Sequence, residues 1–381
     1  MYMNLRRIHK IQFARLLTTG LVFCVVMLYW EELDHHVVSH VRSYSYRYLV
    51  NSYNFLNSSN TLKGNSINPP FHPYIINQLE KCSGSDDILL LLFVKSPPQN
   101  VDRRRDIRET WGNMDSVGKK LNANVKIMFV LGVHPDKSQR KTSQKQIENE
   151  NQIYKDIIQQ NFMDTFHNLT IKLIMQFHWA VKHCPKAKFV MSADDDIFVH
   201  MPNMVRYLRK LEQKQVTNFW VGHVHRGAPP VRRKVSKYHV PVEMYPWPSY
   251  PDYTAGAGYV VSGDVAAKIH QVSQLLNSSM HIDDVFMGMC AQAIGVTPQD
   301  YVYFSGEGTT RYHPCIYANM ITSHGHADDV RVLWKEATDP NVDKMSEGFL
   351  MNLYCTAVKI ALLCVPHLQN TYGCMGAFTF T

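Results

Sequence analysis

Short apolar runs alternate along this chain with segments of helical character, and this alternation restricts its possible folds more than any other feature. Ile88–Val94, Val125–Gly132 and Lys188–Ser192 are brief, largely apolar and bounded by proline, glycine or charged residues. Such runs are typical of strands buried on both faces of a parallel sheet. Between the second and third runs, the pattern predicts helices over Lys141–Gln160 and Asn168–His183. We therefore expect an α/β sandwich around a mostly parallel sheet.

Carboxylates follow the third run directly. Asp194, Asp195 and Asp196 stand between it and the apolar segment Ile197–Val199. Ligands of open α/β sheets usually bind at the carboxyl ends of the parallel strands, and Asp oxygens suit Mg²⁺ or Mn²⁺. A solvated acidic turn would explain a bare Asp triplet, but its position between two apolar strands favours a cation site.

The N-terminus predicts a membrane anchor. Leu16–Trp30 carries no charge, follows a basic segment and ends at Glu31. As a helix it would span about 22 Å, which suits a thin membrane. A cleaved signal peptide is the alternative, but the bulky residues Met27–Trp30 disfavour it. We expect a cytoplasmic tail over 1–15, a signal-anchor helix over 16–30 and a lumenal remainder, as in a type II membrane protein.

The lumenal part is expected to contain three regions. Residues 31–85 are rich in Tyr, Asn, Ser and His with little periodicity, which indicates a loosely ordered stem. A folded α/β domain is expected over 86–345, and a Cys-containing apolar C-terminal extension over 346–381. Within the extension, Gly348–Val365 predicts a helix packed on the domain, and a position at the lumenal leaflet is the further hypothesis.

Glycosylation acceptors and cysteines agree with a lumenal location. Asn57, Asn168 and Asn277 each begin an Asn-x-Ser/Thr triplet. An odd number of cysteines follows the span, so in an oxidising lumen at least one thiol stays free or pairs between chains. The formal charge of +8 is scattered along the chain, so a nucleic-acid partner is not expected.

Ordered sequence blocks add a family resemblance that covers roughly Asp87 to Trp334. The blocks are Arg103–Gly112, Phe129–Gly132, Asp194–Asp196, Tyr250–Ser262 and Asp283–Gly288. In this order they resemble the β-1,3-glycosyltransferase family of galactosyl- and N-acetylglucosaminyltransferases. The resemblance implies a GT-A-like, single-domain nucleotide-sugar glycosyltransferase fold that inverts the anomeric carbon of the donor.

The resemblance also implies a metal site. Asp196 corresponds to the principal ligand of Mn²⁺ or Mg²⁺, Asp194 lies nearer the ribose or the metal shell, and Asp195 supports nucleotide binding. The late metal-binding histidine of the family corresponds best to His324, with His326 as the alternative because it stands two residues away.

The resemblance also implies a catalytic base, and Asp284 matches the catalytic carboxylate of the family. Its neighbour Asp283 stands where relatives commonly have Glu, and the shorter side chain would alter acceptor contacts. Without the family, the Asp pair would equally suit the start of the following helix. Gly256 and Gly258 are expected to permit close backbone approach near the sugar, and a plain β-bulge is the alternative.

Cationic and aromatic residues supply further candidates. Arg104 and Arg108 lie one helical turn apart, which suits a diphosphate. Trp111 is interpreted as packing either on uracil or in the core. Trp247 belongs to an aromatic, proline-stiffened segment that would stack on acceptor sugars or pack as an ordinary loop.

The function implied by the resemblance is inverting transfer of N-acetylglucosamine from UDP-GlcNAc to the 3-hydroxyl of a terminal galactose, on a glycolipid at the Golgi membrane. A β-1,3-galactosyltransferase using UDP-galactose is the sister-enzyme alternative. A non-catalytic, membrane-anchored glycan-binding protein is the alternative class, which Asp194, Asp196 and Asp284 together disfavour because binding alone needs no base. A homo-oligomer is compatible with the sequence.

Overall fold

The computed structural model describes residues 2–55, 72–84, 87–276, 279–306, 308, 313–339, 348–364, 374 and 377. The chain divides into two compact units. The smaller unit is Met1–Tyr53 with Gly227–Tyr250, and the larger is Asn54–Arg226 with Pro251–Thr381. The predicted acceptors Asn57 and Asn277 lie outside the described residues.

Helices dominate the smaller unit. It contains α1 (Tyr2–Leu28), α2 (Trp30–Leu33), η1 (Asp34–Val38) and α3 (Ser39–Leu49). Lys10–Leu28 is long and apolar enough to cross a membrane, with a mean hydropathy of 1.9. A signal sequence can have the same length and composition. The Ser43 hydroxyl donates to Gly227 O (2.5 Å) and the Tyr53 hydroxyl donates to Tyr250 O (3.1 Å). These two bonds join the ends of the segment 227–250 to the helical segment of the same unit. The segment expected to be a loose stem is therefore helical as far as Leu49.

The larger unit is built on one eight-stranded sheet in the order β1-β4-β3-β2-β5-β10-β7-β11. Its strands are β1 (Tyr74–Ile76), β2 (Ile88–Lys95), β3 (Val125–Val133), β4 (Ile157–Met163), β5 (Ala187–Asp194), β7 (Trp220–Gly222), β10 (Tyr259–Ser262) and β11 (Gln299–Asp300). The central run β4-β3-β2-β5 is parallel, whereas β10 pairs antiparallel with both β5 and β7. The predicted α/β class with a mostly parallel sheet is confirmed.

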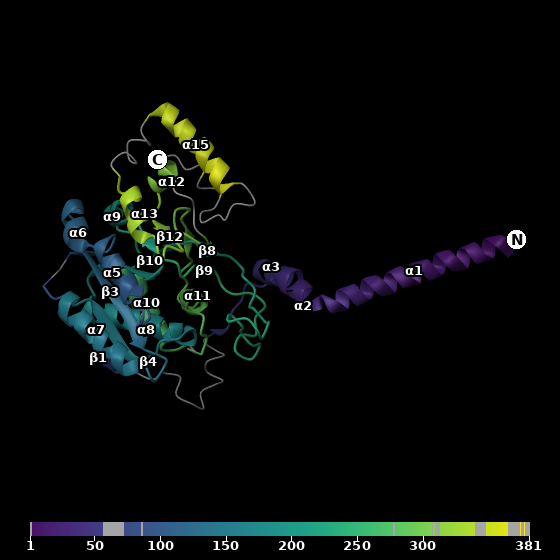
Figure 1. The fold of residues 1–381 in the computed structure, drawn as a ribbon, viewed down its shortest axis with the longest axis horizontal. Helices are drawn as coiled ribbons and strands as arrows, with labels where there is room; N and C mark the ends of the chain where they lie inside the picture. The colour runs from purple at the N-terminus through teal and green to yellow at the C-terminus, as the bar shows by residue number, and fades with distance from the viewer. Residues whose placement is uncertain are drawn as a thin grey trace. The chain divides into compact units, whose positions relative to one another are not determined.

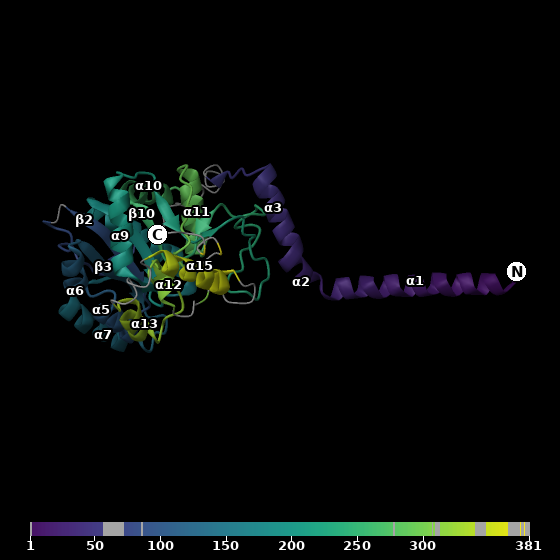
Figure 2. The ribbon, with the colours of Figure 1, turned by 90° about the horizontal axis from the view of Figure 1, so that it is seen from above.

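Helices pack on both faces of this sheet, as the alternation of buried side chains along β2 shows. Phe93 points to α8 (Leu169–His183), where its ring lies 5.9 Å from that of Trp179. Its neighbours Leu92 and Val94 join the opposite core cluster. The helices of that second layer include α5 (Val101–Glu109), α6 (Met114–Leu121), α7 (Arg140–Tyr154) and α9 (Met201–Gln213), whereas α10 (Gly263–Ser273) packs beside α8 (Figures 1 and 2).

Small elements complete the unit. β6 (Phe198–Val199) pairs with β12 (Thr322–Ser323), and β8 (Val224–His225) pairs with β9 (Tyr253–Thr254). The remaining helices are η2 (Phe166–Asn168), α11 (Asp283–Ala293), α12 (Pro314–Tyr317), α13 (Val330–Ala337) and α15 (Phe349–Leu363).

The predicted helix over Lys141–Gln160 is wrong at its end. Helix α7 stops at Tyr154, because Lys155 adopts a left-handed conformation with φ 49°. The residues that follow form the buried strand β4. Its polar residue Gln159 is satisfied there, since its side-chain amide donates to Gly132 O at 2.9 Å.

Disulfides join Cys82 to Cys184, Cys315 to Cys355 and Cys364 to Cys374. Cys290 is free and buried, as the odd number of cysteines after the span required. The pair Cys315–Cys355 fixes the predicted C-terminal helix, α15, to the larger unit.

Candidate active site

Asp284 lies in the first turn of α11, where the helix dipole favours a negative charge. The backbone N–H of Gly256 donates to Asp284 Oδ2 at 3.0 Å. The other oxygen, Oδ1, is buried and has no hydrogen-bond partner among the described residues. A Cβ atom at Gly256 would lie 2.6 Å from Oδ1, so any other residue there would have to displace this carboxylate. Close approach, rather than a simple bulge, explains the glycine.

Lys95 joins this carboxylate region to the Asp triplet. It ends β2, is 5% exposed, and places Nζ 2.7 Å from Asp283 Oδ2 and 3.1 Å from Asp194 Oδ1. Burial raises the pKa of Asp284 well above its usual range, and the charge of Asp283 adds to this effect while Lys95 opposes it. The site thus holds a carboxylate of raised proton affinity with one oxygen unpartnered.

Asp194 is the last residue of β5. Its side chain remains 39% exposed, yet its surroundings still remove much of its hydration. This desolvation raises the pKa of Asp194 to about 6, the charges of Asp283 and Asp196 raise it further, and Lys95 offsets part of the rise. Lys95 therefore links Asp194, at the end of β5, to Asp283, at the start of α11.

Asp195 points into the protein. Its oxygens accept hydrogen bonds from Ser96 Oγ (2.7 Å), Asn100 Nδ2 (2.9 Å) and Arg103 Nη1 (3.1 Å), and the residue is 7% exposed. Its carboxylate is thus occupied by the loop and helix that follow β2. In this arrangement Asp195 fixes the triplet and offers little to a nucleotide directly.

Asp196 faces His324, because β12 pairs with β6 just after the triplet. Ser323 lies opposite Phe198, and this register brings His324 Nε2 to 3.6 Å from Asp196 Oδ2. Although burial acts to raise the pKa of Asp196, the nearby His324 and the charge of Arg103 outweigh it and lower that pKa. Oδ1 of Asp196 is buried and lacks a partner in the described part of the chain.

His326 is turned away from this pair. Its Nε2 lies 2.7 Å from Ser323 Oγ and its Nδ1 lies 3.0 Å from Asp329 Oδ1, so both ring nitrogens are engaged. The ring is also buried, with the residue 5% exposed. Of the two candidate histidines, His324 is the one that meets the Asp triplet.

The donor set fits a hard divalent cation whose coordination is completed by other ligands. Within the described residues, no three His, Cys, Asp or Glu side chains converge on one point. Asp196 and His324 do converge, and Asp196 Oδ1 is unpartnered. Mg²⁺-type ions commonly bind one or two protein carboxylates and take their remaining ligands from phosphate and water.

Arg104 and Arg108 form a separate, internally paired cluster. Arg104 is fully buried and donates from Nε and Nη2 to the two oxygens of Glu150, each at 2.8 Å. Arg108 donates twice to Asp156, each at 2.8 Å, and its Nη1 lies 2.7 Å from Glu150 Oε1. Its guanidinium also lies 4.1 Å from the ring centre of Tyr154. The structure therefore does not bring these arginines to the Asp triplet with donors open to a diphosphate.

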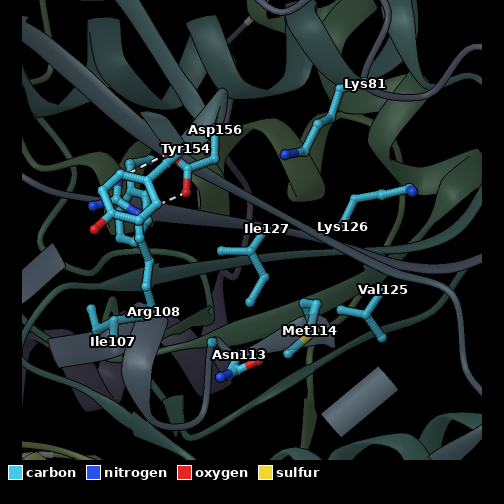
Figure 3. Close-up of a pocket in the computed structure, with 12 residues that line it drawn as sticks. Lys81, Ile107, Arg108, Asn113, Met114, Val125, Lys126, Ile127, Tyr154 and Asp156 are labelled. Carbon is cyan, nitrogen blue, oxygen red and sulfur yellow. Dashed lines mark hydrogen bonds and ion pairs between the residues drawn. The ribbon is translucent and has the colours of Figure 1, made fainter. Parts of the chain in front are cut away.

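Trp111 is 0% exposed and belongs to the hydrophobic core, which favours the core interpretation over contact with uracil. Nearby, a cavity of about 440 Å³ opens at the amino ends of β3 and β4 (Figure 3). Figure 3 shows the Arg108–Asp156 pair beside Tyr154 at this cavity. Neither Asp196 nor Asp284 lines it.

Comparison with known proteins assigns the family. The family model described as Galactosyltransferase matches residues 102–302, which is more than half of the chain. The chain belongs to the galactosyltransferase family. It is 57% identical over 385 residues to "Lactosylceramide 1,3-N-acetyl-beta-D-glucosaminyltransferase A" of Danio rerio, with 100% of both chains covered. It is 56% identical over 373 residues to "Lactosylceramide 1,3-N-acetyl-beta-D-glucosaminyltransferase" of Homo sapiens, with 98% of each covered.

A solved mannosyltransferase, Ktr4p of S. cerevisiae, matches 72% of this chain and 87% of its own with a TM-score of 0.34 and 9% identity. Because both the TM-score and the sequence identity are low, this similarity carries no argument about fold or function. For this galactosyltransferase-family chain, the assignment rests on the sequence relatives.

Two residues near the site were not predicted. Lys95 bridges Asp194 and Asp283, and its sequence signal was a lysine at the end of an otherwise apolar run. Arg103 contacts Asp195 and is 36% exposed, so it is the arginine of the basic run with access to solvent beside the triplet. The sequence favoured Arg104 because spacing alone does not distinguish buried from accessible positions.

The other predicted residues have plain positions. Gly258 has φ 149°, and a Cβ there would meet Met191 and Thr322 at 3.3 Å. Trp247 belongs to the smaller unit, where its ring lies 5.0 Å from that of Tyr245. Asn168 precedes α8 and donates from Nδ2 to Met163 O at 2.8 Å.

Proposed function

We propose that this chain is an inverting β-1,3-N-acetylglucosaminyltransferase that transfers N-acetylglucosamine from UDP-GlcNAc to the 3-hydroxyl of the terminal galactose of lactosylceramide. The donor sugar and the acceptor come from the names of relatives more than half identical over nearly the whole chain. The observation that carries the chemistry is the unpartnered Oδ1 of Asp284, held beside Gly256. Binding alone would not require a buried carboxylate with an open oxygen.

In the proposed reaction, Asp284 accepts the proton of the acceptor 3-hydroxyl while that oxygen bonds to the anomeric carbon of the donor. The bond from this carbon to the UDP oxygen breaks, and UDP leaves with the electron pair. Lys95 holds Asp283 and Asp194 in place, and Gly256 orients Asp284. Proximity and the raised proton affinity of Asp284 are the contributions of the protein to this step.

The proposal includes a divalent cation, Mn²⁺ or Mg²⁺, held by Asp196 and His324 with Asp194 nearby. When bound, such an ion neutralises charge that develops on the departing diphosphate. The support is the Asp196–His324 pair and the unpartnered oxygen of Asp196. Arg103 contacts the neighbouring Asp195 and keeps access to solvent, so we propose it, in place of the paired Arg104 and Arg108, as a phosphate contact.

We further propose that α1 is an uncleaved signal anchor and that the remainder of the chain faces the Golgi lumen. The apolar stretch Lys10–Leu28 and its basic flank support this orientation. The disulfides agree with an oxidising compartment. The boundaries predicted for the stem, catalytic domain and extension stay predictions.

The test is product analysis with full-length protein in lactosylceramide-containing vesicles. UDP-GlcNAc and UDP-galactose are supplied in parallel with Mn²⁺, and the glycosidic linkage of the product is determined by NMR. We expect N-acetylglucosamine linked β1→3 to galactose. Transfer of galactose alone would favour the galactosyltransferase alternative, and no transfer from either donor would overturn the proposed function.

A further inference from the structure

Helix α15 exposes apolar side chains to solvent along one face. The exposed fractions are 82% for Phe349, 77% for Leu350, 62% for Leu353, 48% for Tyr354 and 38% for Ile360. These positions are separated by helical intervals of three, four and seven residues, so they form one continuous stripe. Figures 1 and 2 show α15 as a separate yellow helix beside α12.

The charged residue of α15 lies on the opposite, buried face. Lys359 is the one charged residue in the helix, yet it is 5% exposed and its Nζ lies 5.7 Å from the ring centre of Tyr303. Cys355 and Leu363 share this inner face, at 5% and 0% exposure. The helix is therefore amphipathic in the reverse sense to a helix on a water-soluble surface, because its one charge is buried while Leu350 and Leu353 are exposed.

Such a face indicates an apolar partner. Removing exposed Leu and Phe side chains from water is favourable, and contiguous apolar patches commonly mark interaction sites. The exposed stripe contains no charge that would select an acidic or basic protein surface. A lipid interface demands apolar area without specific charge pairing, which matches this composition.

The inner face ties α15 to the segment that carries His324. Cys355 is bonded to Cys315 of α12. Tyr303, which lies under Lys359, accepts at its carbonyl from the N–H groups of Ile321 (3.0 Å) and Thr322 (3.2 Å), just before His324. The position of α15 is thus linked through a few direct contacts to the proposed metal-binding histidine.

We propose that the exposed face of α15 lies on the lumenal membrane leaflet and holds the candidate active site at the level of a glycolipid head group. The membrane is chosen over a second copy of the chain because the same chain carries a helix long enough to span a bilayer. This inference rests on the proposed function, since the membrane contact would serve transfer to an acceptor that is itself in the membrane.

The contact is tested directly by photocrosslinking. Benzoylphenylalanine is placed at Leu353 in the full chain, reconstituted in phosphatidylcholine vesicles, with Leu275 as the matched control because it is 60% exposed elsewhere. We expect lipid adducts at position 353 and few at position 275. Chain-to-chain adducts at 353 would assign the face to a second copy, and equal lipid labelling at both positions would overturn the proposal.

Activity supplies the second arm. The double variant Leu350→Glu with Leu353→Glu is compared with Ile153→Glu, whose side chain is 73% exposed on α7. We expect transfer to lactosylceramide in vesicles to fall roughly tenfold or more in the double variant, because two apolar contacts with lipid are lost. Transfer to free lactose should stay unchanged, and Ile153→Glu should resemble wild type on both acceptors.

The outcomes separate the two proposals. Normal transfer to both acceptors by the double variant would overturn the membrane contact and leave the proposed function standing. Equal loss on both acceptors would mean that α15 supports the fold instead of the lipid contact. Failure of the wild type to use either acceptor would overturn the proposed function, while the crosslinking result would still decide where α15 lies.

Discussion

Two of the clusters of buried charge in the described part of the larger unit differ in one respect. In the cluster of Arg104, Arg108, Glu150 and Asp156, the carboxylate oxygens are all matched by guanidinium donors. In the cluster at the carboxyl ends of the strands, Asp196 and Asp284 each keep a buried oxygen without a partner. A fully paired charge cluster holds elements together, whereas an incompletely paired one is prepared for a ligand or a proton.

Chelation of divalent metal gives the largest expected change. Treatment with EDTA should remove transfer activity, and Mn²⁺ should restore it, because Asp196 and His324 would hold the ion that neutralises the leaving diphosphate. The His324→Ala variant should need roughly ten- to hundredfold more Mn²⁺ for half-maximal activity. His326→Ala is the control and should lower the melting temperature without changing the Mn²⁺ requirement. Full activity in EDTA would contradict the proposal that transfer requires a divalent cation.

The paired cluster is tested by Glu150→Gln. This change leaves the fully buried Arg104 without its counter-charge, so the free energy of unfolding should fall by about 3–5 kcal/mol. Activity per folded molecule should be kept, since the cluster is not part of the reaction. Glu148→Gln, at an exposed position on the same helix, is the control for chemical denaturation. Large loss of activity with unchanged stability would mean that this cluster binds substrate after all.

Gly256→Ala tests whether the position of Asp284 matters. The added Cβ would lie 2.6 Å from Asp284 Oδ1 and must displace the carboxylate, so kcat should fall about a hundredfold. UDP binding, measured by calorimetry, should remain. The control is Gly118→Ala on α6, where the nearest atom would be 3.3 Å away. Similar kcat in the two variants would contradict the tight placement of the base.

The pH profile should show the smallest effect. Asp284 must be ionised to accept a proton, and its pKa is raised by burial and by Asp283, so kcat/KM should fall as pH drops through a value above the usual carboxyl range. Asp283→Asn removes a neighbouring negative charge and should move this acidic limb to lower pH. A shift to higher pH, or no shift, would show that Asp284 does not control the limb.

Sequence reasoning predicted those parts of the fold that depend on apolar pattern. Strands β2, β3 and β5 and helix α8 begin and end within a few residues of their predicted bounds. Strand β4 was missed because its Gln and Asn residues continue the polar character of α7. Their hydrogen-bond partners, such as Gly132 O, are distant in sequence and leave no local signal.

In the candidate site, too, sequence reasoning succeeded where the signal is local and failed where partners are distant in sequence. The Asp triplet could be predicted because three carboxylates next to buried strands are unusual in any local context. Arg104 and Arg108 were predicted to face a diphosphate, but their spacing gave no information about Glu150 and Asp156, which occupy their donors. The choice between His324 and His326 likewise depended on the pairing of β12 with β6, which brings one of them to Asp196.

The most direct test of the account is the turnover of Asp284→Asn at saturating UDP-GlcNAc and acceptor, compared with Asp87→Asn, whose carboxylate is 83% exposed. We predict that kcat of Asp284→Asn falls about 10²- to 10⁴-fold while UDP affinity and melting temperature are kept, because only the proton acceptor is lost. A kcat within a few-fold of wild type would contradict the claim that the unpartnered carboxylate performs the reaction.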